Sequence, residues 1–516
     1  MSDNQSWNFR PCGPQDWAFV RKLRTHPANL HGFVYRGPIS EEQHAAYMAE
    51  HASSMFIGMA NGQPQGFVGI TGSADSPECI LCVAPAFHGN GFGTFLLRKM
   101  LNQHPDLPAK VLRTNEASLA VFRRLMREIE ADETFVYFRG AKEPSIPFNR
   151  PVLQGGEWAA MQNAIADGAI SGNKSFCKMA ESQLSELHGD AAILLTNSCT
   201  SALEIAALLL QLQPGDEVIV PSFTFVSSAN AFASRGATIR FADVDPMTGC
   251  ICPASVASRI TERTRAVVAV HYAGRPCDID ALIKLKANHD FVLIEDNAHG
   301  LGGHIDGQPL GTFGDLSTLS FHETKNITCG EGGALVLPNN SPFLEAARMI
   351  RDKGTDRHAF IAGKTDAYRW QTHGSNFVLS DILAAFLTAQ LRELQPITAK
   401  RKALIAGYRR ELGAWADSKG VTLMPDHTSA APHLFYGLFP DKPKRDRFLE
   451  QMGKRNILAV HHYLPLHESP FVQRQNWPID HCPNAKAFAD RLVRWPLFND
   501  MSETEFTAIC NATLVS

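Results

Sequence analysis

The spacing of apolar and polar positions changes character near residue 140. Before that point, short apolar runs are broken by turn residues and alternate only twice with helix-length stretches. This pattern predicts a small α+β domain with a hairpin closed by an Asn-Gly turn. The expected hairpin, strand, helix, strand-plus-helix and closing strand cover residues 57–70, 80–83, 94–101, 111–126 and 133–138.

After that point, short apolar, β-rich segments alternate with helix-length stretches. Such a rhythm predicts a mostly parallel sheet with helices on both faces, an α/β fold. From about residue 390 a long helix follows, then hairpin-like segments at 433–440 and 457–465, which indicate a smaller α+β subdomain. The expected strands of the sheet are 191–195, 217–221, 237–243, 265–270, 291–296, 317–321 and 333–337.

The short polar stretch RGAKEPS separates these two patterns. We therefore expect one domain over residues 1–140, a linker over 141–146 and a second domain over 147–516. Within the second domain, we expect a large part up to about residue 390 and a small subdomain over 391–516.

Composition narrows the class of protein. The chain has 516 residues, of which 44% are hydrophobic and 20% charged, and this excludes a disordered, collagen-like or coiled-coil protein. No apolar stretch is long enough to span a membrane, and the first residues lack a basic segment followed by an apolar run. We expect a cytoplasmic protein.

Charge and cysteine content exclude further classes. The net charge is −3, and neither part of the chain has the basic excess of a nucleic-acid or anionic-membrane binder. We interpret the one basic cluster, residues 440–448, as a solvated loop. Eleven scattered cysteines fit a reducing compartment. Cys79 and Cys82 belong to an apolar strand with no second pair at zinc spacing, so we expect core packing and no metal.

The most informative stretch of the first domain is residues 83–97. A strand ends at Val83, a loop contains Gly89, Gly91 and Gly93, and a helix then begins. Glycines let the backbone approach a polyanion, and the N–H groups of a helix start attract it, so we expect a pyrophosphate here. Rossmann proteins also carry such glycines, but the preceding strands look antiparallel, which does not suit a Rossmann fold.

Residues 7–138 resemble the GNAT acyltransferase family, in which this loop holds coenzyme A. The resemblance implies acetyl-CoA as cosubstrate and assigns Val83 to the pantetheine arm. It assigns the pyrophosphate to residues 88–93, where the family signature begins with His88 in place of Gln or Arg. Asn115 matches the family asparagine that begins the next helix and contacts the coenzyme.

This sequence departs from the GNAT pattern at Phe122, where many members place a tyrosine as general acid. A phenyl ring donates no proton, so another group or water must take that role. Residues 29–48 resemble the substrate side of GNAT enzymes that acylate nucleotide-linked amino sugars. Candidates for the missing acid or base, each of which also fits an ordinary surface or core position, are Tyr35, His31, His44 and Glu78.

In the second domain, chemically useful residues follow successive strands. Residues 192–210 indicate a strand, a Ser/Thr-rich loop and a helix, an arrangement that binds phosphate. Asp296 ends a later strand, and Lys325 follows the next one. Pyridoxal phosphate requires this set, because a lysine holds its aldehyde as a Schiff base and an acid keeps its ring nitrogen protonated. Taken singly, each residue also fits an ordinary α/β sheet.

From about residue 146 to its end, the chain resembles the DegT/DnrJ/EryC1/StrS sugar aminotransferases, of fold type I. The resemblance rests on segments such as PSFTFVSSANAF, EDNAHG, SFHETKN and GSNFVLSDILAA, and it is greatest to the transaminases that form dTDP-4-amino-4,6-dideoxygalactose. It implies pyridoxal 5′-phosphate, with Lys325 as Schiff-base lysine and proton shuttle and Asp296 at the ring nitrogen. His299 would lie near the ring hydroxyl and Phe225 on the ring face, with the phosphate on Thr200, Ser201 and Ser320.

The same resemblance implies a homodimer, because Asn376 matches an asparagine that reaches in from the partner subunit. Residues 461–467 match a segment near the sugar, and their histidines lack metal spacing. Family members that deoxygenate sugars have histidine in place of this lysine, so Lys325 favours transamination.

These observations lead to a bifunctional hypothesis: glutamate aminates a dTDP-linked 4-keto-6-deoxyhexose, and acetyl-CoA then acetylates the new amine. Three alternatives stay open: a transaminase with a non-catalytic acetyl-CoA-binding domain, a domain that acetylates protein amines, and a regulator without turnover. The sequence leaves open the nucleotide (dTDP or UDP), the C3 or C4 position, the stereochemistry of the amine and the oligomer beyond a dimer.

Overall fold

The computed structural model describes residues 7–73, 76–141, 146–168 and 170–516. The chain divides into two compact units, Met1–Pro144 and Ser145–Ser516. No helix among the described residues is long and apolar enough to cross a membrane.

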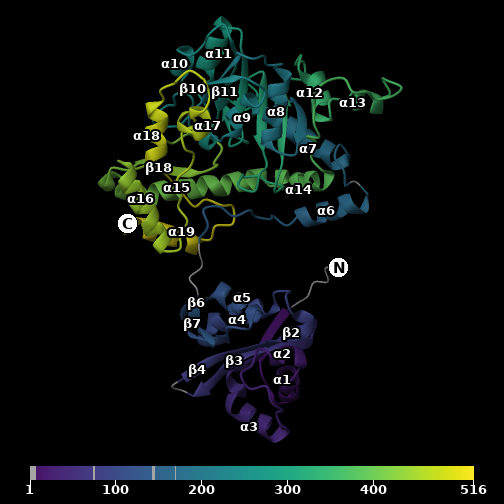
Figure 1. The fold of residues 1–516 in the computed structure, drawn as a ribbon, viewed down its shortest axis with the longest axis vertical. Coiled ribbons are helices and arrows are strands. Elements are labelled where there is room, and N and C mark those ends of the chain that lie inside the picture. Colours follow the sequence, from purple (N-terminus) through teal and green to yellow (C-terminus); the bar gives the residue numbers. More distant parts are fainter. Residues whose placement is uncertain (1–6, 74–75, 142–145, 169) are drawn as a thin grey trace. The chain divides into compact units, whose positions relative to one another are not determined.

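The first unit contains two antiparallel sheets (Figure 1). Asn61 and Gly62 join the second and third strands of the larger sheet, and both have positive φ, 51° and 74°, as a two-residue hairpin turn requires. The larger sheet has the order β1 (Trp7–Pro11), β2 (Met55–Ala60), β3 (Gln63–Ser73) and β4 (Ser76–Val83). The smaller has the order β5 (Pro108–Leu112), β7 (Phe135–Ala141) and β6 (Met126–Ala131).

Helices pack on both faces of the larger sheet. Because successive side chains of a strand point to opposite faces, the adjacent buried residues Phe67 and Val68 belong to different hydrophobic clusters. Cys79 and Cys82 likewise pack on opposite faces, and both thiols are free. Phe67 lies with α1 (Trp17–Arg24) and α3 (Glu41–His51), and Val68 with α4 (Phe92–Gln103) and α5 (Glu116–Leu125).

The second unit is built on a seven-stranded sheet. Five neighbouring strands run parallel, and β16 alone runs against the rest, so the expected mostly parallel sheet is confirmed. The strand order is β10 (Thr238–Ala242), β9 (Glu217–Pro221), β11 (Thr264–Val270), β12 (Val292–Asp296), β15 (Leu316–Ser320), β16 (Gly333–Leu337) and β8 (Ala192–Thr196).

Alternation along β16 shows how the helices cover both faces of this sheet. Ala334 and Val336 face a cluster that includes α7 (Ser175–Leu187), while Leu335 and Leu337 face α8 (Cys199–Leu209). Burying each of the valine and leucine side chains contributes roughly 1.5–3 kcal/mol. The other helices of the unit's large part are α6 (Glu157–Ala166), α9 (Ser227–Ala233), α10 (Pro253–Ala257), α11 (Ile279–Asn288), α12 (Leu344–Arg351) and α13 (Arg357–Ile361).

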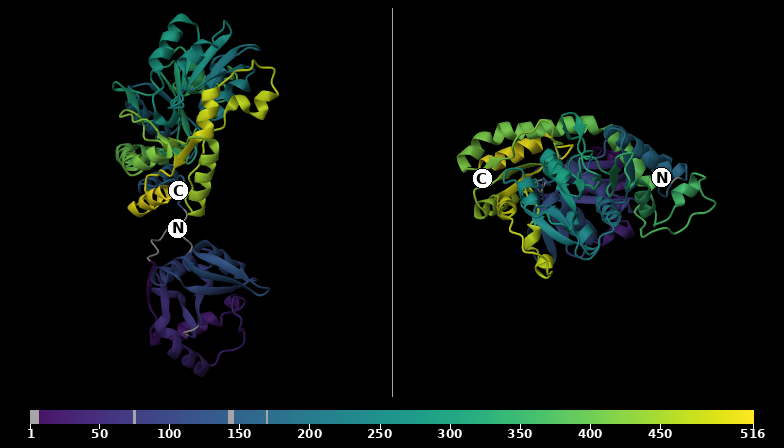
Figure 2. Two further views of the ribbon diagram at one scale, coloured as in Figure 1. Left: turned by 90° about the vertical axis from the view of Figure 1, so that its left-hand side faces the viewer. Right: turned by 90° about the horizontal axis from the view of Figure 1, so that it is seen from above.

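Two long helices, α14 (Asp381–Arg392) and α15 (Leu394–Lys419), run end to end along one side of this unit (Figures 1 and 2). The chain then forms a three-stranded antiparallel sheet with its own helices. The sheet contains β17 (Thr422–Leu423), β18 (Phe435–Leu438) and β19 (Leu492–Trp495), and the helices are α16 (Lys442–Lys454), α17 (Pro470–Gln473), α18 (Pro483–Arg491) and α19 (Glu503–Leu514).

Two predictions for the C-terminal segment are wrong. The basic cluster at 440–448 is the start of α16, capped by Asp441, with Arg445 and Phe448 buried. Its charges had masked an amphipathic helix whose apolar side packs on the small sheet. The segment 457–465 pairs with its neighbours only through isolated bridges and forms no hairpin, and its residues 460–463 line a cavity.

Candidate active site

A cavity of about 580 Å³ opens in the second unit where the parallel strands end. The N-terminus of α8 and the segments that follow β9, β12 and β15 form one side of it, and the small subdomain forms the other. The carboxyl ends of parallel strands all reach this edge, which is where open α/β sheets bind ligands.

The start of α8 supplies hydroxyl groups and free helix N–H groups. The Ser198 side chain caps the helix by accepting from the Ser201 N–H at 3.1 Å. The hydroxyls of Thr200 and Ser227 lie 2.8 Å apart, and both residues line the cavity. An anion placed here would meet both hydroxyls and the positive end of the helix dipole.

Asp296 ends β12 and lines the same cavity. The Ser228 hydroxyl donates to its Oδ2 at 2.7 Å, and the Ala298 N–H donates to its Oδ1 at 3.2 Å. These bonds hold the carboxylate in one orientation inside the protein, which suits a partner for a protonated ring nitrogen.

Lys325 follows β15, and the accessible part of its side chain lines the cavity. The pKa of its ammonium is lowered to about 8, chiefly by burial; the charges of Cys199 and Asp296 oppose this shift, and the positive charge of Arg494 adds to it. A lysine with such a pKa is partly neutral near pH 8 and can act as a nucleophile or a base.

Three imidazoles, those of His299, His433 and His462, stack in this cavity. Burial lowers the pKa of each well below its usual value, so all three are neutral. The Ala273 N–H donates to His299 Nδ1 at 3.3 Å, which leaves the other ring nitrogen facing the Tyr463 hydroxyl at 3.4 Å.

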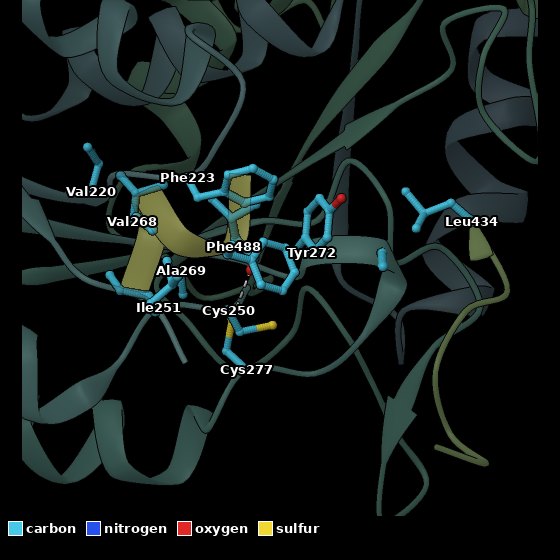
Figure 3. Packing of buried hydrophobic residues seen from close by; sticks show 14 of the residues in the cluster. Val220, Phe223, Cys250, Ile251, Val268, Ala269, Tyr272, Cys277, Leu434 and Phe488 are labelled. Atoms are coloured by element: carbon cyan, nitrogen blue, oxygen red, sulfur yellow. Dashed lines mark hydrogen bonds between the residues drawn. The ribbon is translucent and has the colours of Figure 1, made fainter. Parts of the chain in front are cut away.

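The hydrophobic core sets the position of His462. Tyr272 is fully buried, and its ring packs edge-on against those of Phe223 and Phe488 (Figure 3). From that packing its hydroxyl reaches His462 Nδ1 at 2.8 Å. A group held through a packed core keeps its geometry without help from a ligand.

Six of the residues predicted for this site line the cavity: Thr200, Phe225, Asp296, His299, Ser320 and Lys325. Phe225 is 54% exposed, so its ring is open to a ligand in the cavity. Ser201 is buried one step behind, where its hydroxyl donates to Asn197 Oδ1 at 2.6 Å. Asn376 lines a different cavity of about 550 Å³, together with Lys353 and Arg357.

Sequence analysis missed several residues of the cavity. Ser227 and Ser228 stand in the quoted segment PSFTFVSSANAF, and their place after a strand was a usable signal. His433 and Arg494 come from β18 and β19 or the loops beside them, more than 100 residues beyond Lys325. No local pattern could bring them to the site.

A second cavity, of about 430 Å³, lies in the first unit, between the end of β4 and helices α4 and α5. All six residues predicted to hold coenzyme A line it: Val83, His88, Gly89, Gly91, Gly93 and Asn115. Asn115 also caps α5, accepting from the Ser118 N–H at 3.1 Å. The Val83 carbonyl accepts from the side chains of His88, at 3.1 Å, and Asn29, at 3.3 Å.

Two glycines shape the loop of this cavity. Gly89 and Gly91 have φ of +76° and +91°, values that other residues rarely adopt, and Gly91 is the N-cap of α4. A Cβ added at Gly89 would meet no atom within 4 Å, so the loop backbone borders open space where a pyrophosphate could lie. Arg124, which sequence analysis missed, lies on the α5 face that carries Ala117 and Val121 to the cavity.

Of the four candidates for the acetyltransferase acid or base, only His31 lines this cavity. His44 is buried, with Nε2 2.7 Å from the Trp17 carbonyl, and Tyr35 is exposed. Glu78 pairs with Lys110 at 2.6 Å across the gap between β4 and β5.

Phe122 lies behind the wall of this cavity. It is 4% exposed and packs on Phe138, with ring centroids 5.7 Å apart. The ring therefore fills the core and does not itself face the ligand space. Over the described residues of both units, no group of His, Cys, Asp and Glu has the geometry of a metal site.

Family models match both parts of the chain. The Acetyltransferase (GNAT) family model matches residues 19–126, and the DegT/DnrJ/EryC1/StrS aminotransferase family model matches residues 154–514. The chain belongs to the DegT/DnrJ/EryC1/StrS aminotransferase family and carries an N-terminal GNAT domain.

Solved structures agree with this assignment. The aminotransferase TlmJ from Streptoalloteichus hindustanus is 27% identical, with a TM-score of 0.66, over 72% of this chain and 98% of that one. PseC of Helicobacter pylori, an aminotransferase of pseudoaminic acid biosynthesis, is 26% identical, with a TM-score of 0.66, over 72% and 99%. The PLP-form of a putative sugar aminotransferase, Spr1654 from Streptococcus pneumoniae, is 25% identical, with the same TM-score, over 72% and 98%.

Members of this family use pyridoxal phosphate, and the larger cavity fits it. The hydroxyls at the start of α8 suit the phosphate, the carboxylate of Asp296 suits the ring nitrogen, and Lys325 suits the aldehyde carbon. The exposed ring of Phe225 suits the flat face of the cofactor. The GNAT domain implies acetyl-CoA as cosubstrate.

Proposed function

We propose that this aminotransferase first transfers an amino group from L-glutamate to a 4-keto-6-deoxyhexose linked to dTDP, and that its GNAT domain then acetylates the new amine. The observation that carries the proposal is the joining of two cavities in one chain. One brings together Lys325, Asp296 and the hydroxyl groups at the start of α8, and the other is lined by a glycine loop at a helix start. The first reaction creates the nucleophile that the second one needs.

The residues of the larger cavity have distinct tasks in this proposal. Bound pyridoxal phosphate would act as an electron sink that stabilises negative charge on the carbon losing its proton. Lys325 Nζ would take that proton and, as the ammonium, hold it for return on the other side of the transferred nitrogen, for which a pKa of about 8 is well suited. Asp296, fixed by Ser228, would hold the ring nitrogen protonated. The site would work as a dimer, with Asn376 of the partner subunit completing it.

In the smaller cavity, positioning of the two reactants contributes more to the rate than acid–base chemistry does. The thioester of acetyl-CoA is already reactive toward a neutral amine, and holding the two together supplies much of the rate. His31, the only one of the four candidates that lines this cavity, would accept the proton that the attacking amine releases.

The joining of the two units in one chain favours sequential action. Family models match residues 19–126 and 154–514 of the same polypeptide. Tethering raises the effective concentration of the second site for the product of the first.

One incubation tests the proposal. The full-length protein, pyridoxal phosphate, glutamate, dTDP-4-keto-6-deoxyglucose and acetyl-CoA are mixed, and mass spectrometry identifies the nucleotide sugars. We expect the acetamido sugar with the wild-type protein and unchanged keto sugar with Lys325→Ala. Omitting acetyl-CoA should leave the free amino sugar.

Each other outcome identifies the part that fails. Accumulation of the free amino sugar in the presence of acetyl-CoA would reject the acetylation step and favour a GNAT domain that only binds the coenzyme. No new nucleotide sugar would reject this substrate, and UDP-linked and 3-keto sugars would then be compared in the same assay.

A further inference from the structure

Arg494 is a partly buried cation without an anionic partner. It lies in β19, and its side chain lines the aminotransferase cavity. Its Nε has no hydrogen-bond partner, and its guanidinium contacts the ring of Phe148 at 5.3 Å. Within the described ranges, no carboxylate lies at ion-pair distance from it.

Other arginines of this unit donate to protein groups, and Arg275, whose Nε also has no partner, donates through a terminal nitrogen to the Pro425 carbonyl at 2.8 Å. Arg401 donates to the carbonyls of Pro432 and His433 and, at 2.8 Å, to Asn499 Oδ1. Arg240 pairs with Asp480 at 3.0 Å. Burying a charge is costly unless it is paired or hydrogen-bonded. The unpaired guanidinium of Arg494 therefore indicates that an anion belongs in the cavity.

The charged groups already in the cavity do not supply this anion. Asp296 is held by Ser228 and Ala298, and Glu331 lies 3.6 Å from His322. His299, His433 and His462 are neutral, and Lys325 carries a positive charge of its own. The anion must therefore come with a ligand.

The position of Arg494 relative to Lys325 selects among the possible anions. Arg494 and Lys325 line the same cavity of about 580 Å³, and the positive charge of Arg494 lowers the pKa of Lys325. The phosphate of the cofactor belongs at the start of α8, with the cavity hydroxyls. An amino acid must place its nitrogen where Lys325 Nζ lies, and its α-carboxylate is then one carbon away. The phosphates of a nucleotide sugar lie beyond the whole hexose ring from the reacting carbon.

We infer that Arg494 binds the α-carboxylate of the amino donor, with His462 and Tyr463 beside it in the cavity wall. This inference rests on the proposed use of an amino acid as donor. A planar guanidinium binds a carboxylate through two parallel hydrogen bonds, which would fix the α-carbon for proton removal by Lys325. While the keto sugar occupies the site, the guanidinium of Arg494 would have no carboxylate bound to it.

Binding to the loaded protein separates this role from general damage to the site. The wild-type protein, Arg494→Leu and Arg494→Lys are loaded with pyridoxal phosphate and titrated with 2-methyl-L-glutamate, which has no α-proton to lose, and with 4-aminobutyrate, which has no α-carboxylate. Absorbance of the cofactor reports binding. Arg455→Leu removes an exposed arginine of the same subdomain and is the matched control.

We expect Arg494→Leu to weaken binding of 2-methyl-L-glutamate by roughly 30-fold or more, because it removes one partner of a buried charge pair. Arg494→Lys should lose less, and neither variant nor Arg455→Leu should change binding of 4-aminobutyrate more than about twofold. Equal weakening of both probes, or of neither, would overturn the inference.

A parallel titration tests the rival anion. The protein loaded with pyridoxamine phosphate is titrated with the dTDP-linked keto sugar, and we expect equal affinity for the wild type and Arg494→Leu. Loss of sugar binding with donor binding intact would show that Arg494 binds phosphate and would overturn the inference. If no amino acid binds to the loaded wild-type protein or converts its cofactor to the amine form, the proposed function fails together with the inference. If amino acids convert the cofactor of the wild type and of Arg494→Leu equally well, only the inference fails.

Discussion

The two cavities of this protein are lined by different kinds of residues. The aminotransferase cavity carries ionisable groups of its own, among them Lys325, Asp296 and Arg494, each placed by a different strand end or subdomain. The GNAT cavity is bordered by glycines, apolar side chains and a capped helix, and Arg124 is the one arginine or lysine along its described lining, which contains no carboxylate.

This difference follows from the chemistry that each cavity would perform. Transamination must remove a proton from carbon, so the protein has to supply a base, an acid and counter-charges in fixed positions. Acetyl transfer brings together a reactive thioester and an amine, so a shaped surface supplies most of what is needed. Side-chain chemistry should therefore dominate the first site and backbone shape the second.

The strongest test removes the nucleophile of the first cavity. Lys325→Ala should lower transamination by at least about 10⁴-fold, because it removes both the covalent anchor and the base. Acetylation of a supplied amino sugar should be unchanged. Mass spectrometry follows both reactions. Lys364→Ala, which removes an exposed lysine, is the control. A parallel fall in acetylation would contradict the separation of the two sites.

The pH dependence of cofactor capture tests the environment of Lys325. Its pKa of about 8 means that the ammonium predominates below pH 8 and cannot attack an aldehyde. Capture of pyridoxal phosphate by the apo-protein, read by absorbance, should therefore slow about tenfold per pH unit below 8 and level off above it. An inflection near the ordinary lysine value of 10.5 would show that burial does not shift this group.

The GNAT cavity should respond to a change of backbone shape. Gly89→Ala strains a backbone with φ of +76° and places a methyl group in the open space of the loop. We expect acetyl-CoA binding, measured by calorimetry, to weaken about tenfold, since left-handed backbone costs other residues roughly 1–2 kcal/mol. Gly62→Ala imposes similar strain at the β2–β3 turn, where φ is +74°, and should leave binding unchanged.

The smallest effect on activity is expected from Phe122→Tyr. Because this ring packs in the core on Phe138, the added hydroxyl would be buried and would not reach the cavity. Acetylation should change less than about threefold, while the free energy of unfolding should fall by roughly 1–3 kcal/mol, as it should for Phe138→Tyr. A tenfold or larger gain in acetylation by Phe122→Tyr alone would show that position 122 does face the acceptor.

Much of the fold followed from local pattern. Each of the seven expected strands of the large sheet is present within about one residue, because each is a short apolar run bounded by turn residues. The turn at Asn61-Gly62 formed as its residues require. Where the pattern was amphipathic and highly charged, as in α16, or apolar without strand pairing, as in 457–465, local reasoning was wrong.

The sequence by itself determined the residues that stand at or after the end of a strand, or near the start of a helix: Thr200, Asp296, Lys325, Gly89 and Asn115. Their places depend on local hydrogen bonds and on the common edge of a parallel sheet. Only the tertiary structure decided that Phe122 lies in the core, that Glu78 forms an ion pair with Lys110, and that Arg494 lines the same cavity as Lys325. Those facts depend on packing between segments far apart in the chain, which no local spacing of residues encodes.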